Sequence, residues 1–253
     1  MARAVTLRRL GLAAALTGLA TLPAHAQRYY DNGRNAPSRF EAPYNGGFAF
    51  VRLFYDRYPG WSYDYPDMEM NLMSIMSQIS NIKVHHEARN ILHMDDPALF
   101  KYPVAYISEP GYWHPSEEAV KNLRAYIQKG GFLIIDDFHY DNEWAVFEAA
   151  ITRVLPDAKI MRLDVKHPIF NTFFQIPTLH IPYPGRLGER GLYGEFYGIH
   201  QDNDPDKPLQ VVIDYNMDIG DYMEYSGSGF YLVDPSNEAF KLMINYLIYG
   251  HTR

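Results

Sequence analysis

Short apolar segments alternate with amphipathic helical segments through the first two thirds of the chain, and this alternation limits the possible folds more than any other feature. The segments with strand character are 48–55, 83–87, 104–108, 132–135 and 159–163. The helical segments between them are 67–79, 117–129 and 143–154. Short connections between strands and helices favour parallel strands joined by crossover helices. The alternation therefore predicts an α/β fold in three layers, with a mostly parallel sheet and helices on both faces.

The pattern changes after residue 165. Prolines at 168, 177, 182 and 184 interrupt an irregular stretch, and two further strands are expected at 193–200 and 209–215. A final helix is expected at 237–249, where large apolar residues recur at helical spacing. We interpret residues 46–253 as a single α/β domain with an elaborated C-terminal third.

The first 26 residues have the pattern of a secretory leader. Arg3, Arg8 and Arg9 precede the apolar run 10–22, and Ala24–His25–Ala26 is a small-x-small cleavage pattern. This run is shorter than the ~20 residues that span a bilayer, and no other stretch reaches that length. We expect a signal peptide cut after Ala26, a periplasmic or secreted location, and no membrane span after removal of the leader. Residues 27–45 are expected to be a flexible lead-in.

Charge and cysteine content exclude several classes of function. The predicted leader contains three of the 23 Lys and Arg residues and none of the 30 acidic ones, so the net charge of −7 becomes −10 without it. This balance argues against nucleic acid as a partner, because binding to phosphates requires a basic surface. The absence of cysteine excludes disulfides, Cys-based zinc sites, iron–sulfur clusters and any thiol nucleophile.

Acidic, histidine and aromatic residues follow four of the expected strands. In open parallel sheets, ligands bind beyond the carboxyl ends of the strands, so these residues are candidates for a site. The catalytic candidates are Asp136, Asp137, His139 and His167. The ligand-binding candidates are Trp61, Tyr65, Asp67, Glu109, Trp113 and His114. Carboxylate and imidazole groups suit proton transfer near neutral pH, and aromatic rings beside carboxylates are typical of sugar binding.

The same residues also have structural interpretations. Acids that follow a strand often form a turn or cap the next helix. Adjacent residues of a strand point to opposite faces, so at most one of Asp136 and Asp137 is expected to face a cleft. His139 fits a solvated loop, and Trp61 fits a side chain that packs its loop on the domain. No compact ligand spacing such as His-x-x-x-His occurs, so no metal or other cofactor is predicted, although a divalent metal stays possible.

Four motifs in combination resemble a bacterial family known as domain of unknown function 4159. They are FVRLFY (50–55), a Gly-Trp loop leading to Asp64-Tyr65-Pro66, GGFLIIDD (130–137) and HPIF (167–170). The resemblance covers about residues 47–250. The same layout is similar to the class I glutamine amidotransferase-like superfamily, particularly to ThuA-like trehalose-utilisation proteins. The resemblance implies a flavodoxin-like arrangement of the sheet.

The chain departs from amidotransferases at the nucleophile. In that superfamily a Gly-Gly-apolar strand leads to the sharp turn that holds the cysteine, and the resemblance implies that 136–139 occupy this turn here. His167-Pro168-Ile169 matches the later motif of the superfamily. Glutamine hydrolysis through a thiolate intermediate is excluded, since the chain has no cysteine.

Three functions stay open at this point. The first is an enzyme that acts on a sugar or polyol with Asp and His acid–base groups. The second is a non-catalytic binding or scaffold protein, because relatives are commonly encoded or fused with MoxR and von Willebrand-type envelope modules, as the resemblance implies. The third is an envelope sensor that binds a small polar or carbohydrate-like ligand without chemistry.

Overall fold

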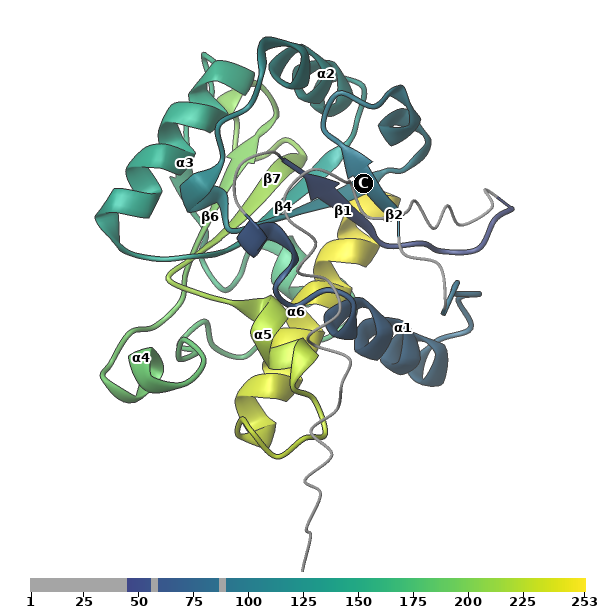
Figure 1. Ribbon diagram of the computed structural model, residues 1–253, viewed down its shortest axis with the longest axis vertical. Helices are drawn as coiled ribbons and strands as arrows, with labels where there is room; N and C mark the ends of the chain where they lie inside the picture. Colours follow the sequence, from purple (N-terminus) through teal and green to yellow (C-terminus); the bar gives the residue numbers. More distant parts are fainter. Residues whose placement is uncertain (1–44, 56–58, 87–89) are drawn as a thin grey trace, which may run out of the picture.

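A seven-stranded mixed sheet forms the centre of the computed structural model, which describes residues 45–55, 59–86 and 90–253 (Figure 1). The strand order is β2-β1-β3-β4-β7-β6-β5. The strands are β1 (Val51–Phe54), β2 (Asn90–His93), β3 (Val104–Ser108), β4 (Phe132–Phe138), β5 (Met161–Arg162), β6 (Glu195–His200) and β7 (Leu209–Tyr215). The first five strands in this order are parallel, whereas β6 pairs antiparallel with β7 and β5 antiparallel with β6. The predicted α/β fold with a mostly parallel sheet is confirmed.

Helices cover both faces of the sheet (Figure 1). One face packs on α2 (Glu117–Gln128) and α3 (Tyr140–Val154). The other packs on α1 (Asp67–Ile79), α5 (Ile219–Glu224) and α6 (Val233–Thr252). The short α4 (Arg186–Glu189) lies in the connection between β5 and β6. Two apolar cores result, and the strands separate them because successive side chains alternate between the faces.

The order of the strands reverses at one point of the sheet, where a ligand-binding crevice is expected. From β1 the chain goes to β2 on one side and then to β3 on the other, so the direction of winding reverses between β1 and β3. In open α/β sheets, ligands bind at such a reversal, beyond the carboxyl ends of the strands. The residues that follow β1, β3, β4 and β7 therefore decide what this end of the sheet can bind.

Several predicted elements are confirmed to the residue, one predicted strand was wrong, and one helix was missed. Strands 104–108 and 209–215 and helix 67–79 have the predicted bounds. In the described part of the strand expected at 83–87, which excludes Glu87, there is a bridge between Val84 and Phe48, and the strand beside β1 is instead the mostly buried segment Asn90–His93. Helix α5 was not predicted, because six residues are too few to show a helical period.

The described residues do not bear on the predicted leader. Residues 1–26 and all but the last residue of 27–45 lie outside them. Among the described helices, none combines the length and the apolar character needed to cross a membrane.

We expect the replacement Ser116→Ala to lower the free energy of unfolding by about 1 kcal/mol. The Ser116 hydroxyl accepts a hydrogen bond from the Ala119 amide (3.1 Å), which has no partner within the helix. Urea denaturation measures the change. Ser77→Ala is the matched control, because Ser77 is exposed within α1 and caps nothing. Equal losses in the two variants would contradict the capping role.

Candidate functional site

The end of β4 is bulged, and the bulge brings two adjacent aspartates to the same side of the sheet. The pairing of β4 with β7 shifts register between Ile135 and Phe138, and Asp137 has a positive φ of 63°. Asp136 faces α5, while Phe138 packs in the core on the opposite face. Tyr106 of β3 packs on the α5 side of the sheet, and Ser108, two residues later in the same strand, faces the same side. Asp137 accepts a hydrogen bond from Ser108, so Asp137 lies on this side too. The expectation that the two carboxyls lie on opposite faces was wrong, since it assumed a regular strand.

Asp136 is a structural carboxyl beneath the site. It has no exposed surface and accepts hydrogen bonds from the Tyr106 hydroxyl (2.9 Å) and from the amides of Ile219 and Gly220 (3.0 and 3.1 Å). Burial raises its pKa to about 7, although these hydrogen bonds act in the opposite direction. Asp136 therefore attaches the first turn of α5 to the end of β4.

Of the two carboxyls of β4, Asp137 is the one that can still bind a ligand. The Ser108 hydroxyl donates to its Oδ2 atom at 3.2 Å, and the side chain is 7% exposed. Burial raises the pKa of Asp137 well above its ordinary value, and the charge of Glu109 raises it further. A carboxyl in this position holds its proton at neutral pH more readily than one in water.

Glu109 follows β3 directly and also has a left-handed backbone, with a φ of 55°. Its carbonyl accepts a hydrogen bond from the Tyr55 hydroxyl at 2.6 Å, so the ends of β1 and β3 are joined at the reversal of the sheet. The side chain is partly exposed. Burial raises the pKa of Glu109 to about 8, with further contributions from the charges of Glu143 and Asp64.

Three more acids join these two from distant segments. We use the name strand-end cluster for Asp64, Glu109, Asp137, Asp218 and Asp221. Asp218 caps α5 by accepting from the Asp221 amide (2.7 Å), and burial together with the charges of Asp137 and Asp221 raises the pKa of Asp218 well above its ordinary value. The Asp64 carboxylate lies where a side chain at Gly220 would stand, so only glycine permits this approach.

Two further side chains lie at the edge of the strand-end cluster. His139 caps α3: its amide donates to Glu143 Oε2 (2.7 Å), and its Nδ1 lies 3.4 Å from the same oxygen. The Tyr183 ring lies 5.3 Å from the His139 ring. Burial raises the pKa of Tyr183, and the charges of Asp218 and Asp137 raise it further, so its hydroxyl stays a proton donor.

Backbone strain is concentrated at the same end of the sheet. Six non-glycine residues in the described ranges have a positive φ, and four of them lie at or just after the carboxyl ends of β3, β4 and β7. These four are Glu109, Asp137, Tyr140 and Asn216. Such conformations cost on the order of 1–3 kcal/mol each and persist where the surrounding structure enforces them, which is typical of functional sites.

A buried arginine lies under the cluster. The Arg52 guanidinium contacts Glu69 (2.6 Å), the Trp61 carbonyl (2.8 Å) and Asp64 (3.5 Å), and it is 1% exposed. It also lies 5.0 Å from the centre of the Tyr106 ring. Arg52 therefore anchors one acid of the cluster but presents no charge to a ligand.

The structure places the predicted aromatic residues mainly in the core. Trp113 has no exposed surface, and its indole lies 3.0 Å from the Met94 sulfur. Trp61 is 6% exposed and packs on Phe54. His114 is exposed. None of these residues is among the groups that shift the pKa values of the strand-end cluster.

Tyr65 and Asp67 lie at the start of α1. Tyr65 is partly buried against the core that α2 and α3 cover, and Asp67 is the first residue of the helix. The charge of Asp67 contributes to the raised pKa of Glu224, to which burial and Asp64 contribute more. Asp67 is therefore near the outer side of the site rather than within the strand-end cluster.

His167 lies at the opposite end of the sheet from the aspartates of β4. After β5 the chain turns, with the His167 amide donating to the Asp164 carbonyl (2.8 Å), and His167 Nε2 lies 3.2 Å from His200 Nε2. His200 ends β6 and pairs with Leu209, the first residue of β7. The structure therefore brings Asp136, Asp137, His139 and Glu109 together but leaves His167 apart.

Residues that the sequence analysis missed complete the site. Arg52 had a signal, since an arginine within an apolar strand must find partners inside the protein. Asp218, Asp221 and Tyr183 come from the irregular C-terminal third, where no periodicity indicates which residues return to the sheet. Among the described residues, no group of three His, Asp or Glu side chains converges as a metal site requires.

The arrangement can bind hydroxyl groups and transfer protons. Burial and neighbouring acids raise the pKa of Glu109, Asp137, Asp218 and Asp221, so these carboxyls keep their protons to a higher pH than carboxyls in water. Phosphate and carboxylate ligands are disfavoured, because the charges that surround Asp137 and Glu109 are negative.

Comparison with known protein families places most of the chain in one of them. Residues 49–250 match the model of a family described as Domain of unknown function (DUF4159). No curated protein matches the chain.

Proposed function

Since the chain belongs to the DUF4159 family, whose description names no activity, we propose a function from the strand-end cluster itself. The protein is an enzyme that transfers protons to and from a neutral polyhydroxylated small molecule, a sugar or a polyol. The observation that carries this proposal is the pair formed by Asp137 and Glu109. Both residues have a left-handed backbone, both side chains are at least partly buried, and burial raises the pKa of each carboxyl.

The pair provides an acid and a base at the same pH. The pKa of Glu109, which burial raises to about 8, lies near the working pH of a proton-transfer catalyst. Because the charge of Glu109 raises the pKa of Asp137, the loss of a proton by one carboxyl opposes its loss by the other, and the two titrate as a unit. The Ser108 hydroxyl holds the Asp137 carboxyl, and Tyr183 and His139 offer further donors at the edge.

Hydroxyl-rich ligands fit these groups best. A sugar hydroxyl can accept from a protonated carboxyl and donate to an ionised one, whereas an anion could only accept from the former and would be repelled by the latter. We further propose that the chain is a thiol-free relative of class I amidotransferase-like and ThuA-like proteins. The β2-β1-β3-β4-β7 order and the left-handed Asp137 in the bulged end of β4 support this proposal. We propose a periplasmic or secreted location from the leader pattern of residues 1–26.

The test is the replacement Asp137→Asn, assayed against a panel of glycosides, sugars and polyols. We expect the variant to lose about 10²–10⁴-fold in kcat/KM for any substrate found, which is the usual contribution of a general acid or base. The rate of the natural protein should fall as pH rises through about 8, where Glu109 loses its proton.

Asp141→Asn is the matched control, because Asp141 lies four residues after Asp137 and is exposed in the first turn of α3. It should retain full activity. Turnover that survives in Asp137→Asn would overturn the proposal, and so would a panel without any turnover. Ligand binding that Asp137→Asn weakens, in the absence of turnover, would indicate a sensor instead.

A second candidate is a non-catalytic scaffold in a MoxR and von Willebrand-type envelope system. It is favoured by apolar side chains that are exposed between α5 and α6. Phe230, Leu232 and Val233, the last of which begins α6, are 67%, 77% and 71% exposed, whereas Tyr63, the next most exposed large hydrophobic side chain in the described residues, is 50% exposed. Under this function Asp137→Asn should leave partner binding intact, while Leu232→Ser should weaken it.

A further inference from the structure

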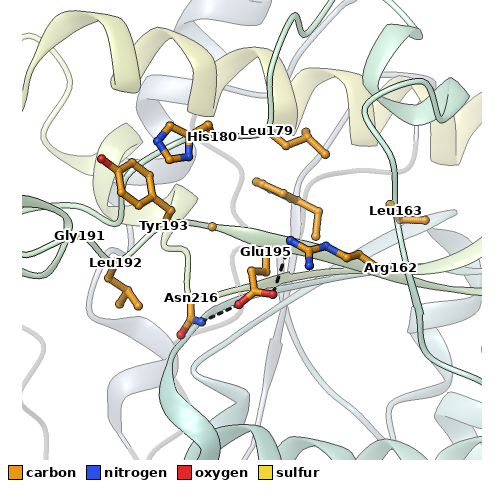
Figure 2. Close-up of a pocket in the computed structure, with 11 residues that line it drawn as sticks. Arg162, Leu163, Leu179, His180, Gly191, Leu192, Tyr193, Glu195 and Asn216 are labelled. Carbon is orange, nitrogen blue, oxygen red and sulfur yellow. Dashed lines mark hydrogen bonds and ion pairs between the residues drawn. The ribbon is translucent and has the colours of Figure 1, made fainter.

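A pocket of about 500 Å³ opens beside the strand-end cluster, between β6 and the segment 179–194 (Figure 2). This volume lies within the range of ~300–1,000 Å³ that is usual for small-molecule sites. The stacked rings of His180 and Tyr193 stand on one side of the pocket and Arg162 on the other, with Glu195 and Asn216 below them (Figure 2). The proposed function does not use any of these residues.

The polar groups of the pocket form a connected and electrically balanced set. Glu195 lies 3.7 Å from the Arg162 guanidinium and accepts hydrogen bonds from Asn216 Nδ2 (3.3 Å) and from the Tyr197 hydroxyl (2.9 Å). The charges of Arg162 and Glu195 oppose each other, so the pocket does not select an ion of either sign. Together these side chains offer both donors and acceptors, as a hydroxyl group requires.

The remaining walls of the pocket are apolar. Leu163, Leu179, Leu192 and Phe196 line it, and the rings of His180 and Tyr193 are stacked 3.8 Å apart with an angle of 15° between their planes. A pyranose ring combines apolar C–H faces with hydroxyls at its rim. Such a ring matches aromatic and aliphatic walls that surround a few polar groups.

Asn216 connects the pocket to the strand-end cluster. It follows β7, is 8% exposed, and has a left-handed backbone with a φ of 52°. Its Nδ2 donates to Glu195 in the pocket, while its Oδ1 accepts from the amide of Tyr140, the residue after His139. Segments 181–183 and 192–194 are hydrogen-bonded to each other through their backbones and lie between the two sites. Tyr193 of one segment lines the pocket, and Tyr183 of the other is near the strand-end cluster.

We propose that this pocket is a second carbohydrate subsite, which binds a neutral pyranose ring next to the strand-end cluster. The substrate then has at least two sugar units, one in each site. This inference rests on the proposed function for the identity of the unit at the cluster. The pocket itself is assigned from its own walls and polar groups.

The test uses the full protein with isotope-labelled leucine methyl groups, because three leucines line the pocket. The probes are methyl glucoside, methyl galactoside, methyl mannoside, maltose and cellobiose, each titrated to about 50 mM, a concentration that detects millimolar affinity. We expect saturable shifts at Leu163, Leu179 and Leu192 with at least one probe, and tighter binding of a disaccharide than of the methyl glycoside with the same sugar unit. Leu123 and Leu133, which are buried on the other face, should not respond.

Variants locate the binding in the pocket. Tyr193→Ala, which removes one stacked ring, should weaken the affinity about tenfold or more. Arg162→Ala should weaken it as well, and this side chain is 69% exposed, so its loss does not threaten the fold. Arg190→Ala is the matched control, because Arg190 is exposed on the adjacent turn and does not line the pocket.

The subsite fails if none of the probes shifts the three leucines, or if both Tyr193→Ala and Arg162→Ala bind as the natural protein does. Equal affinity for each disaccharide and its monosaccharide glycoside overturns the two-unit substrate. Failure of the proposed function looks different. In that case Asp137→Asn retains turnover or no turnover exists, while the pocket leucines still respond.

Discussion

Arg52→Leu should lower the free energy of unfolding by about 3–5 kcal/mol, the usual cost of removing one partner from a buried ion pair. Leucine fits an apolar strand, but Glu69 and Asp64 would lose the charge that they contact at 2.6 and 3.5 Å. Since domains are stable by only about 5–15 kcal/mol, this loss is a large fraction of the total. Urea denaturation followed by tryptophan fluorescence measures it.

Two comparison variants separate the buried charge from lost packing. Glu117→Ala breaks the surface ion pair between Glu117 and Arg153, which are 70% and 43% exposed. Its cost in free energy of unfolding should be about 0.2–1 kcal/mol, as is usual for surface pairs. Arg52→Leu combined with Glu69→Leu should be more stable than Arg52→Leu alone, because it also removes the isolated carboxyl. A double variant no more stable than the single one would show that the packing of Arg52, and not its charge, stabilises the fold.

Stability should decrease as pH rises from 5 to 8.5. Burial raises the pKa of Glu109 and of Glu224 from 4.5 to about 8, and that of Asp136 from 3.8 to about 7. Between the ordinary and the raised pKa the folded state binds more protons than the unfolded state, so the free energy of unfolding falls with increasing pH. We expect a lower melting temperature at pH 8.5 than at pH 5.5.

His167 has the opposite effect on the pH dependence of stability, at acidic pH. Burial lowers the pKa of His167 from 6.5 to about 4, and the charge of His200 contributes to this shift. Its contribution to stability is lost as pH falls from 6.5 towards 4, because the unfolded state then binds the extra proton. Because three carboxyls act against this one histidine, His167 makes the fall in stability between pH 5 and 6.5 less steep but does not reverse it.

Asp137→Asn should flatten the alkaline side of this profile. Asparagine cannot ionise and tolerates the left-handed backbone at this position. The variant should melt higher than the natural protein at pH 8.5, although it is expected to be inactive. Glu118→Gln, an exposed change in the first turn of α2, is the control and should leave the slope unchanged. An unchanged slope in Asp137→Asn would contradict the strained acidic cluster.

Local patterns were sufficient where an element is defined by its own residues. Strand 104–108 is apolar up to its last residue, Ser108, and is followed by Glu109-Pro110, and helix 67–79 repeats its apolar residues at helical spacing. The pattern failed at 83–87, where the structure has a single bridge, because polar residues there resemble the edge of a sheet. The mostly buried segment Asn90–His93 pairs with β1 instead.

The residues of the candidate site also divide into those that the sequence indicated and those that only the packing reveals. The acids directly after β3 and β4 were recognised, because the end of a strand is visible in the sequence. Trp113 was expected to bind a ligand, yet it is fully buried, and only packing distinguishes a core tryptophan from an exposed one. Asp218 lies 81 residues after Asp137 and joins it through the attachment of α5 to Asp136.

The sequence by itself determined the α/β class, most strands and helices, the acids at the strand ends and the absence of thiol chemistry. These features follow from composition and from periodicities of two or 3.6 residues, which depend on neighbours along the chain. The tertiary structure alone decided that both aspartates of β4 lie on one side, that His167 lies at the far end of the sheet, and that Arg52 is paired. These depend on a bulge, on a turn after β5 and on strand order, which arise from contacts between residues that are distant in sequence.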